Sequence, residues 1–148
     1  MEINGVAHTA VTVNSFEECE TFYDKLMPYL GLQVVYRSDN TVYYIGGRTA
    51  YAIGRRDPAY ADQKHNPESI GLHHICFRAR SREDIDQLYL FLQEIEAEIA
   101  YEPQEGPWAP GYYSVSFFDP DGIRLEVNHV PGEGVFAENV QFNPAGDY

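Results

Sequence analysis

The chain has 148 residues, enough for one domain or two very small modules, and its 44% hydrophobic and 22% charged residues are ordinary for a globular protein. Its formal net charge is −13, and such a surface repels nucleic acid and anionic membranes, so we exclude both as primary partners. No apolar run approaches the ~20 residues of a membrane span, and the first residues do not resemble a signal peptide, so a cytoplasmic protein is expected.

The two cysteines, Cys19 and Cys76, do not form a CxxC pair, which argues against a zinc ribbon or a redox motif of that kind. Both are flanked by apolar residues, so we expect two buried free thiols rather than a disulfide. The aromatic fraction is 14%, with 12 tyrosines, which favours strands and is compatible with a ligand cavity.

The first strand is expected at residues 6–13, and a helix follows it. Ser15 with an acid three residues later, Glu18, resembles a capping box that begins this helix. Pro28 and Gly31 are expected to end it. Apolar residues at intervals of three and four mark its buried face, namely Phe16, Cys19, Phe22, Tyr23 and Leu26. Three strand-like runs then follow, separated by turn residues, at 32–36, 41–45 and 49–53.

The second half of the chain repeats the first with a shift of 66 positions. The shift superposes identical residues: His8 on His74, Ser15 on Ser81 and Tyr23 on Tyr89. Ser81 and Asp84 again resemble a capping box, although Asp is a weaker partner than Glu. The apolar face of this second helix is formed by Ile85, Leu88, Leu92, Ile95 and Ile99. Further strands are expected at 98–101, 112–118 and 123–128, so each half is predicted to be a βαβββ module.

The predicted organisation has four parts: a first module at 1–54, a linker at 55–71, a second module at 72–130 and a tail at 131–148. The linker contains two X-Pro pairs, and an insert at 102–111 is rich in Pro and Gly. The tail has no clear periodicity, so a lid, an arm across a partner subunit and an unstructured end all stay open.

Strand alternation places three polar residues on one side of the predicted sheets. His8, His74 and Glu126 each lie opposite the strongly apolar residues of their own strand, which are expected to pack under the helices. Two imidazoles and one carboxylate are a common set of ligands for a divalent metal ion. Taken singly, each residue is more often exposed or hydrogen bonded. Because the two histidines occupy matched positions of the repeat, we favour the metal interpretation.

Four segments carry a family resemblance: VAHTAV at 6–11, FY at 22–23, GLHHI at 71–75 and FDPDGIRLEV at 118–127. With these segments the chain resembles the vicinal oxygen chelate superfamily, which includes glyoxalase I, extradiol dioxygenases, fosfomycin-resistance proteins and bleomycin-binding proteins. The resemblance covers about residues 3–130. It implies an α+β fold in which two βαβββ modules form a curled mixed sheet cup, with the helices on the outer face.

The resemblance also implies one divalent metal ion (Fe, Mn, Ni, Co or Zn) held by His8, His74 and Glu126. The neighbouring His73 has the opposite parity and is a second-choice ligand. The remaining candidates flank the last strands or lie opposite them. Tyr112 and Tyr113 alternate in direction, so one of the two hydroxyls is expected to point toward the site. We predict catalytic roles for Glu126, Tyr51 and Tyr113, and substrate binding by Trp108, Arg124 and Tyr112.

Departures from the family patterns narrow the choice of subfamily. Shifted by 75 positions, Glu126 falls on Tyr51, where glyoxalase I carries a glutamate ligand, so a glyoxalase I site is disfavoured. Extradiol dioxygenases carry a tyrosine three residues before the Asp-Pro-x-Gly turn, where this chain has Ser116. The three-ligand set is more like that of fosfomycin-resistance enzymes. Those enzymes need a cationic pocket for a phosphonate, and in this sequence only Arg124 and Arg78 have the parity to form one. No named subfamily fits cleanly.

Two functions follow from the sequence. The first is a metal-dependent enzyme that binds neighbouring oxygens of a small organic substrate, with lyase, isomerase or dioxygenase-like chemistry. The alternative is a metal-free protein that binds a drug or metabolite, like the bleomycin-binding members. Because a half-cup sheet leaves apolar surface exposed, we expect a homodimer, and metal ligands from one or from two subunits both stay open.

Overall fold

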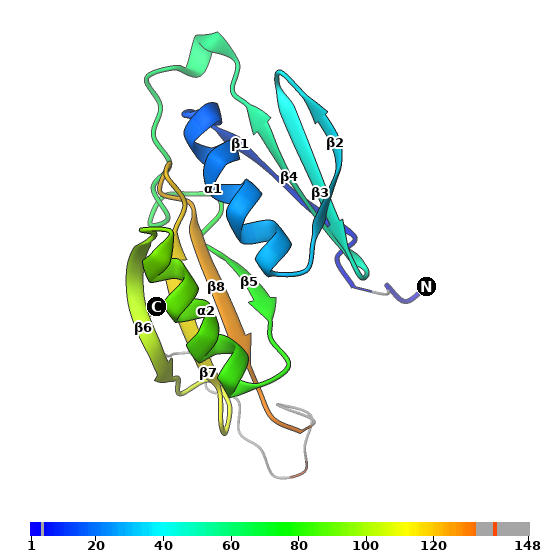
Figure 1. Ribbon diagram of the computed structural model, residues 1–148, viewed down its shortest axis with the longest axis vertical. Helices are drawn as coiled ribbons and strands as arrows, with labels where there is room; N and C mark the ends of the chain where they lie inside the picture. The colour runs from blue at the N-terminus through cyan, green and yellow to red at the C-terminus, as the bar shows by residue number, and fades with distance from the viewer. Residues whose placement is uncertain (4, 133–137, 139–148) are drawn as a thin grey trace. The chain divides into compact units, whose positions relative to one another are not determined.

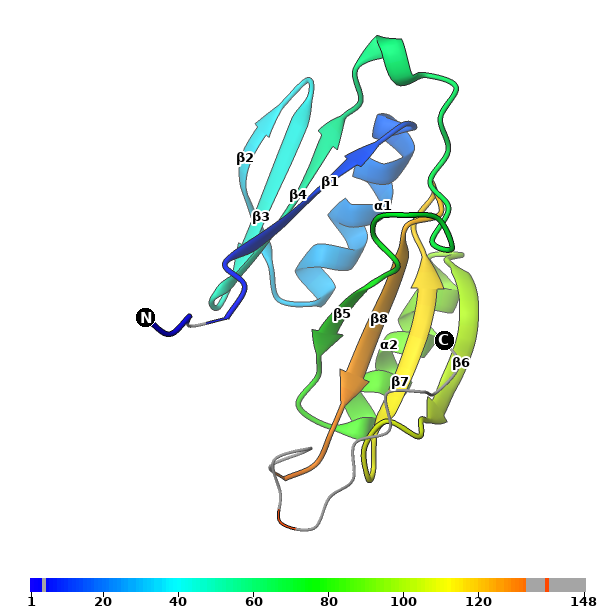
Figure 2. The same cartoon turned by 180° about the vertical axis from the view of Figure 1, so that it is seen from behind.

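A computed structural model describes residues 1–3, 5–132 and 138 of the chain (Figures 1 and 2). The chain divides into two compact units, Met1–His65 and Asn66–Tyr148, and each is described by itself below. Each unit contains one four-stranded mixed sheet and one helix in the order βαβββ, so the predicted α+β class and the two modules are confirmed. Most of the predicted tail at 131–148 lies outside the described residues.

The first unit has its strands in the spatial order β1-β4-β3-β2, with β1 and β4 parallel and the other neighbours antiparallel. Its elements are β1 (His8–Val13), α1 (Phe16–Tyr29), β2 (Gln33–Ser38), β3 (Thr41–Gly46) and β4 (Thr49–Arg55). The helix covers one face of this sheet (Figure 1). Val11 and Val13 are buried while His8 and Ala10 are exposed, as the alternation of β1 predicted.

The second unit repeats this topology with the spatial order β5-β8-β7-β6. Its elements are β5 (Ile75–Arg78), α2 (Arg82–Glu94), β6 (Glu98–Glu105), β7 (Tyr113–Phe118) and β8 (Arg124–His129). The helix contacts β6, β7 and β8. Its buried residues Ile85, Leu88 and Leu92 pack on the face that carries the apolar positions of β7 and β8, namely Val115, Phe117, Leu125 and Val127. The opposite face of the same sheet carries the polar residues.

A tight turn sets the register of β8. The Asp119 carboxylate accepts hydrogen bonds from the backbone N–H groups of Asp121 and Ile123 at 2.9 and 2.8 Å. Gly122 follows with a φ of +83°, a left-handed conformation that glycine adopts without steric strain. This turn fixes where β8 begins and therefore which face of the sheet receives Glu126.

The helix ends differ from the sequence prediction. The Ser81 side chain accepts from the backbone N–H of Asp84, whose carboxylate in turn accepts from the Ser81 N–H, so this capping box is confirmed. Ser15 makes no side-chain capping bond, so the box predicted at α1 is wrong. Pro28 lies inside the last turn of α1 instead of ending the helix before it.

Several helix and strand ends also differ from the predicted ranges. Helix α2 stops at Glu94, so Ile99 is a β6 residue and not part of the helical face. Strand β6 runs on to Glu105 through Pro103, which is tolerated because β6 is an edge strand with a register irregularity at that point. Strand β5 begins only at Ile75, so His74 precedes the strand. The segment between the modules contains a short 3-10 helix at Pro58–Tyr60.

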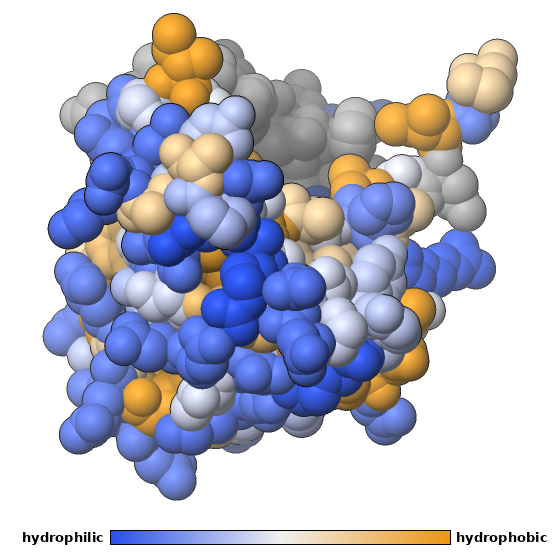
Figure 3. All heavy atoms as spheres, turned by 90° about the horizontal axis from the view of Figure 1, so that it is seen from above, coloured by the Kyte–Doolittle hydropathy of each residue, from blue (hydrophilic) through white to orange (hydrophobic). Residues whose placement is uncertain are grey.

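Hydrophilic residues predominate on the face of the molecule seen in Figure 3, with hydrophobic residues in small separate groups. Within the described part of the chain, no helix is long and apolar enough to cross a membrane. Both cysteines are free, as predicted, but only Cys19 is buried. Cys76 is exposed because β5 is an edge strand and Cys76 points away from the helix.

Candidate functional site

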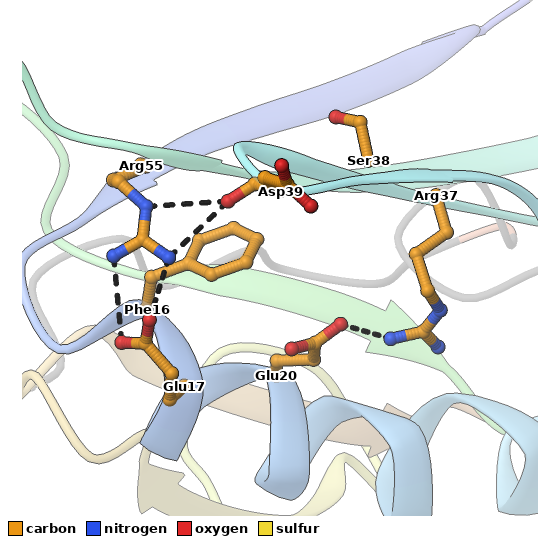
Figure 4. A pocket seen from close by; sticks show the side chains of 7 residues that line it. All are labelled: Phe16, Glu17, Glu20, Arg37, Ser38, Asp39 and Arg55. Atoms are coloured by element: carbon orange, nitrogen blue, oxygen red, sulfur yellow. Dashed lines mark hydrogen bonds and ion pairs between the residues drawn. The ribbon is translucent and has the colours of Figure 1, made fainter.

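A cleft of about 580 Å³ lies at the start of α1 in the first unit, and two arginine–glutamate pairs line it (Figure 4). The Arg55 guanidinium binds Glu17 at 2.6 Å and donates to the Asp39 carbonyl, and it lies over the Phe16 ring. Arg37 pairs with Glu20 on the other side. These ion pairs connect α1 to β2 and β4, so we interpret the cleft as a structural feature, and we call the Arg55–Glu17 and Arg37–Glu20 pairs the clamp.

The strongest candidate in the second unit is the carboxylate of Glu126. It is only 4% exposed, although it points to the polar face of the sheet. The Tyr112 hydroxyl donates to Glu126 Oε1 at 2.6 Å. Burial, then this hydrogen bond, raises the pKa of Tyr112, so the phenol stays a donor. Among the described residues no Lys or Arg forms an ion pair with Glu126.

His74 meets the second oxygen of this carboxylate. His74 Nε2 lies 3.3 Å from Glu126 Oε2, so two of the three residues predicted as metal ligands lie close together. Burial lowers the pKa of His74, and the Glu126 charge opposes that shift only in part. A neutral imidazole keeps a lone pair, which is the form that can bind a metal ion. On its other side, His74 Nδ1 lies 2.7 Å from Nδ1 of His73.

A short loop holds Tyr112 in place. The Trp108 ring packs edge-on against the Tyr112 ring with centroids 4.8 Å apart. The backbone N–H of Gly106 donates to the Tyr112 carbonyl at 3.0 Å, and the Tyr112 N–H donates to the Ala109 carbonyl. Trp108 lies so close over Gly106 that a Cβ there would meet Trp108 Cζ3 at 2.1 Å. The predicted site residue Trp108 therefore contacts Tyr112, and through it the Glu126 carboxylate.

Arg124 lies two residues before Glu126 and on the same face of β8. Its Nε donates to the Ser116 hydroxyl at 3.1 Å, and its guanidinium lies 5.6 Å from the centre of the Tyr101 ring. Burial raises the pKa of Tyr101 to about 12, and its hydroxyl shares a hydrogen bond with Ser114. This cluster provides a cation and hydroxyl groups next to the carboxylate.

Two predicted site residues lie elsewhere. Tyr113 is on the helix side of β7, where its hydroxyl donates to Asp86 of α2 and Arg82 lies over its ring. Tyr51 is fully buried in the core of the first unit, and its hydroxyl lies 2.9 Å from that of Tyr23 on α1. The structure brings neither residue to the polar face of its sheet.

The strand register explains the displacement of Tyr51. Cys76 pairs with Glu126, and its repeat counterpart Ala10 pairs with Ala52. The repeat counterpart of Glu126 is therefore Ala52, and the shift of 75 positions used in the sequence alignment is wrong by one residue. Because strand faces alternate, this one-residue error reverses the predicted direction of Tyr51. Ala52 has no ligating atom, which moves the chain further from the four-ligand pattern of glyoxalase I.

His8 belongs to the first unit, where it is the first residue of β1 and is exposed. Its ring centroid lies 6.3 Å from that of Tyr43 on β3. Across the described residues, no three His, Cys, Asp or Glu side chains are clustered so as to hold one metal ion. The carboxylate of Glu126 and the imidazole of His74 are groups that bind divalent metal ions, so the donor set fits a metal. These two predicted ligands lie together in the second unit, and the third, His8, belongs to the first.

Comparisons with known proteins bear on this site. Residues 5–127 match the family model of the Glyoxalase/Bleomycin resistance protein/Dioxygenase superfamily. The chain belongs to this superfamily. No curated protein matches the chain. The family match spans both units, so the superfamily predicted from the motifs is confirmed, without a subfamily.

Solved structures confirm the fold of this superfamily member. A protein from Bacillus halodurans assigned as a glyoxalase is 27% identical, covers 85% of this chain and 96% of its own, and has a TM-score of 0.77. Lactoylglutathione lyase from Agrobacterium tumefaciens is 23% identical over 86% of this chain and 95% of its own, with a TM-score of 0.66. The fosfomycin resistance protein FosX from Listeria monocytogenes is 17% identical over 86% and 94%, with a TM-score of 0.63.

Sequence reasoning missed two members of the cluster, Tyr101 and Ser114, and did not predict the contact of His73 with His74. Tyr101 was predicted to be the last residue of its strand, and its pairing with Ser116 was not predicted. The register between β6 and β7 places Tyr101 opposite Ser116. Two irregularities in that register prevent its prediction by counting residues along the two strands.

Proposed function

We propose that this superfamily member is a metal-dependent enzyme whose divalent ion is bound by His74 and Glu126, with His8 as the third ligand expected from the sequence. The observation that supports this proposal is the buried Glu126 carboxylate, which faces an imidazole at 3.3 Å and has no Lys or Arg ion pair among the described residues. A buried carboxylate without a cation is unfavourable, so it suits a position that a metal ion neutralises. Members of the superfamily often bind a divalent metal.

The substrate in this proposal is a small organic molecule with neighbouring oxygen atoms. A bound divalent ion supplies a Lewis acid for developing negative charge on such oxygens. Arg124 binds a further anionic oxygen of the substrate, since its guanidinium faces the ring of Tyr101 and retains N–H donors beyond the bond to Ser116. Tyr112 holds the Glu126 carboxylate in one orientation, and Trp108 supports Tyr112.

The reaction class favoured by this arrangement is lyase or isomerase chemistry, with oxygenase chemistry as the second choice. Ser116, which takes the place of the extradiol tyrosine, donates its hydroxyl proton to the Leu125 carbonyl and accepts from Arg124. That hydroxyl is thus occupied within the sheet. The polar face offers oxyanion-stabilising cations and donors rather than the tyrosine expected for extradiol cleavage.

A second candidate function is metal-free binding of a drug or metabolite. The observation in its favour is that the matching superfamily also contains bleomycin resistance proteins. The two functions differ in one property, because a binding protein of this kind takes its ligand in the presence of a chelator.

Calorimetric titration with Zn²⁺, Mn²⁺ and Co²⁺ tests the proposal on protein first stripped with a chelator. The enzyme proposal expects one binding event per chain in the wild type, weakened in His8→Ala and lost in His74→Ala. His65→Gln is the matched control, since His65 lies in the predicted linker and is not one of the three proposed ligands, and it is expected to bind as the wild type does. A wild type that binds none of the three ions contradicts the proposal and favours the binding protein.

A homodimer is part of the proposal. The edge strand β2 exposes three consecutive apolar residues, Val34, Val35 and Tyr36, at 41%, 56% and 58%. A contiguous exposed apolar segment on an edge strand is typical of an association surface. Sedimentation equilibrium at micromolar concentration is expected to give twice the mass of 16.9 kDa, and a monomer under those conditions would contradict this part.

A further inference from the structure

Arg124 is held in place by uncharged groups on the polar face of the second unit's sheet. Its Nε–H donates to the hydroxyl of Ser116 at 3.1 Å, and Ser116 is fully buried. Its guanidinium lies 5.6 Å from the centre of the Tyr101 ring, and the Tyr101 hydroxyl shares a hydrogen bond of 3.2 Å with the buried Ser114. Among the described residues Arg124 forms no ion pair. The side chain is thus oriented by the sheet, while its charge has no carboxylate partner there.

The outer end of this guanidinium fits a carboxylate. With Nε bonded to Ser116, the two terminal nitrogens still present a pair of parallel N–H groups. A planar carboxylate accepts both bonds at once, and its single charge balances that of one arginine. We propose that Arg124 is the specificity-determining residue of the site and binds a carboxylate of the substrate, so that the substrate class is small organic acids. As a statement about the substrate, the inference rests on the proposed function.

The position of Arg124 places this carboxylate beside the proposed metal site. Arg124 and Glu126 lie two residues apart and face the same side of β8, and such positions on one strand are about 7 Å apart. A molecule of a few carbon atoms is long enough to meet both groups. In the first unit the equivalent of Glu126 is Ala52, so the equivalent of Arg124 is Ala50. The topology therefore does not require a cation at this position.

A second arginine on the same face provides the matched control. Arg78 pairs with Asn128 in the register of β5 and β8, so it lies on the other side of Glu126 from Arg124. Arg78 is exposed, whereas Arg124 is half-buried. Solvent screens an exposed guanidinium, so its pairing with an anion contributes little. Arg78→Gln and Arg124→Gln remove the same charge from the same face, but only the second removes the guanidinium that the sheet orients.

Carboxylate binding is tested first on protein stripped with a chelator, with malate as the probe at constant ionic strength. Backbone amide spectra of nitrogen-15-labelled wild type are expected to show saturable shifts in β8 and near Tyr101. These shifts are expected to be lost in Arg124→Gln and kept in Arg78→Gln. A wild type without a saturable response, or an equal loss in the two variants, would overturn the inference.

Protein loaded with Zn²⁺ then shows whether the carboxylate adds to binding through the metal. Malate and lactate both carry a hydroxyl next to a carboxylate, and only malate carries a second carboxylate. Calorimetry is expected to give malate a roughly 10- to 100-fold higher affinity than lactate, as hydrogen bonds to charged groups imply. That ratio is expected to fall close to one in Arg124→Gln and to persist in Arg78→Gln. The same ratio in Arg124→Gln as in the wild type would contradict the role of Arg124.

Two variants of Tyr101 test whether its ring positions the guanidinium. Tyr101→Leu removes the ring, so malate affinity is expected to fall roughly 2- to 30-fold, the range of a cation–π contact. Tyr101→Phe keeps the ring and removes only the hydroxyl that meets Ser114, so it is expected to retain most of the affinity. Wild-type affinity in Tyr101→Leu would contradict the positioning role of the ring.

The two states of the protein distinguish this inference from the proposed function. If the wild type binds no metal ion but malate binding to the stripped protein depends on Arg124, the proposed function fails while the carboxylate subsite stands. If the wild type binds Zn²⁺ but malate and lactate bind equally well, the proposed function stands and the inference on Arg124 fails.

Discussion

Two polar clusters, one in each unit, differ in the hydrogen-bond partners of their carboxylates. In the first unit, the two carboxylate oxygens of Asp24 accept hydrogen bonds from Arg37 at 2.8 and 2.9 Å, and the Tyr44 hydroxyl donates a third. In the second unit, Glu126 is more deeply buried and has a phenol and an imidazole as partners. The first carboxylate is paired with an arginine, and the second has no Lys or Arg ion pair among the described residues. We propose that this difference separates a structural cluster from a metal centre.

The repeat makes this comparison sharper. Ala10 and Ala52 pair in the first unit where Cys76 and Glu126 pair in the second. The same topology thus carries two methyl groups in one module and a thiol and a carboxylate in the other. The two units share one topology, so their chemical difference comes from the side chains at equivalent strand positions.

The largest expected effect is at Glu126. Glu126→Gln keeps the shape and the bond from Tyr112 but removes the charge, so metal affinity is expected to fall by more than about 100-fold, beyond the loss seen for outer partners. The melting temperature of the metal-free protein is expected to be at least that of the wild type, since an uncompensated buried charge disappears. Calorimetry with Zn²⁺ and thermal unfolding in a chelator measure the two effects. A variant that binds Zn²⁺ normally would remove the distinction between the clusters.

A smaller effect is expected at the loop that supports Tyr112. Gly106→Ala would place a Cβ 2.1 Å from Trp108 Cζ3, so Trp108 must move and release the Tyr112 ring. Overpacking of this kind costs about 1–3 kcal/mol of unfolding free energy. The emission of Trp108, the single tryptophan, is expected to shift, and metal affinity to weaken with it.

Gly54→Ala is the matched control for that loop. A Cβ at Gly54 meets only ordinary contacts at 3.9 Å, so tryptophan emission and metal affinity are expected to stay at wild-type values. If Gly106→Ala also leaves both readouts unchanged, the loop does not support the site.

The structural cluster is expected to respond to alkaline pH and not to metal. Burial, then the bond to Asp24, raises the pKa of Tyr44 above its ordinary value of about 10. Above that pH the native state holds a proton that the unfolded chain loses, so unfolding free energy falls as pH rises. Tyr44→Phe lacks this dependence. It is expected to be about 0.5–1.5 kcal/mol less stable at pH 8, from the lost hydrogen bond.

Urea unfolding at pH 8 and near pH 11 measures this difference. The gap between wild type and Tyr44→Phe is expected to narrow at the higher pH, while Zn²⁺ affinity stays the same in both proteins. A gap that is constant with pH would show that Tyr44 ionises equally in the folded and unfolded chain.

The smallest effect is expected at the exposed clamp of the first unit. Arg55→Met removes the pair with Glu17 but keeps an apolar chain over Phe16. Solvent and salt screen such an exposed pair, so we expect a slight fall in melting temperature that vanishes in about 1 M NaCl, with metal affinity unchanged. A loss of metal affinity here would show that the cleft takes part in the site.

The sequence predicted most of the fold because its signals were local. Alternation in β1 and β8 and the Ser81 box were sufficient to place strands and a helix, and the repeat predicted that both modules have the same topology. The Ser15 box failed although it has the same spacing, because a cap depends on the backbone angles before the helix and these differ between the two serines. Strand β6 was predicted too short because Pro103 was expected to lie outside a strand, whereas an edge strand tolerates a proline.

The candidate site was predictable only in part. His74 and Glu126 converge as expected because each had a clear parity or repeat position. Tyr51 was misplaced because a one-residue difference in register turns a side chain to the other face. Of the neighbours Tyr112 and Tyr113, it is Tyr112 whose hydroxyl reaches Glu126. The contact of Trp108 with Tyr112 depends on the path of a loop, and loop geometry leaves no periodic signal in the sequence.

The measurement that tests the central claim most directly is the metal content of tag-free protein purified without chelator. Wild type, His74→Ala and the control His65→Gln are compared by mass spectrometry. The proposed site predicts about one Fe, Mn, Ni, Co or Zn per chain in the wild type and in the control, and none in His74→Ala. Wild-type protein that stays empty after reconstitution with each metal, or a His74→Ala protein that keeps its metal, would contradict the site built on Glu126 and His74.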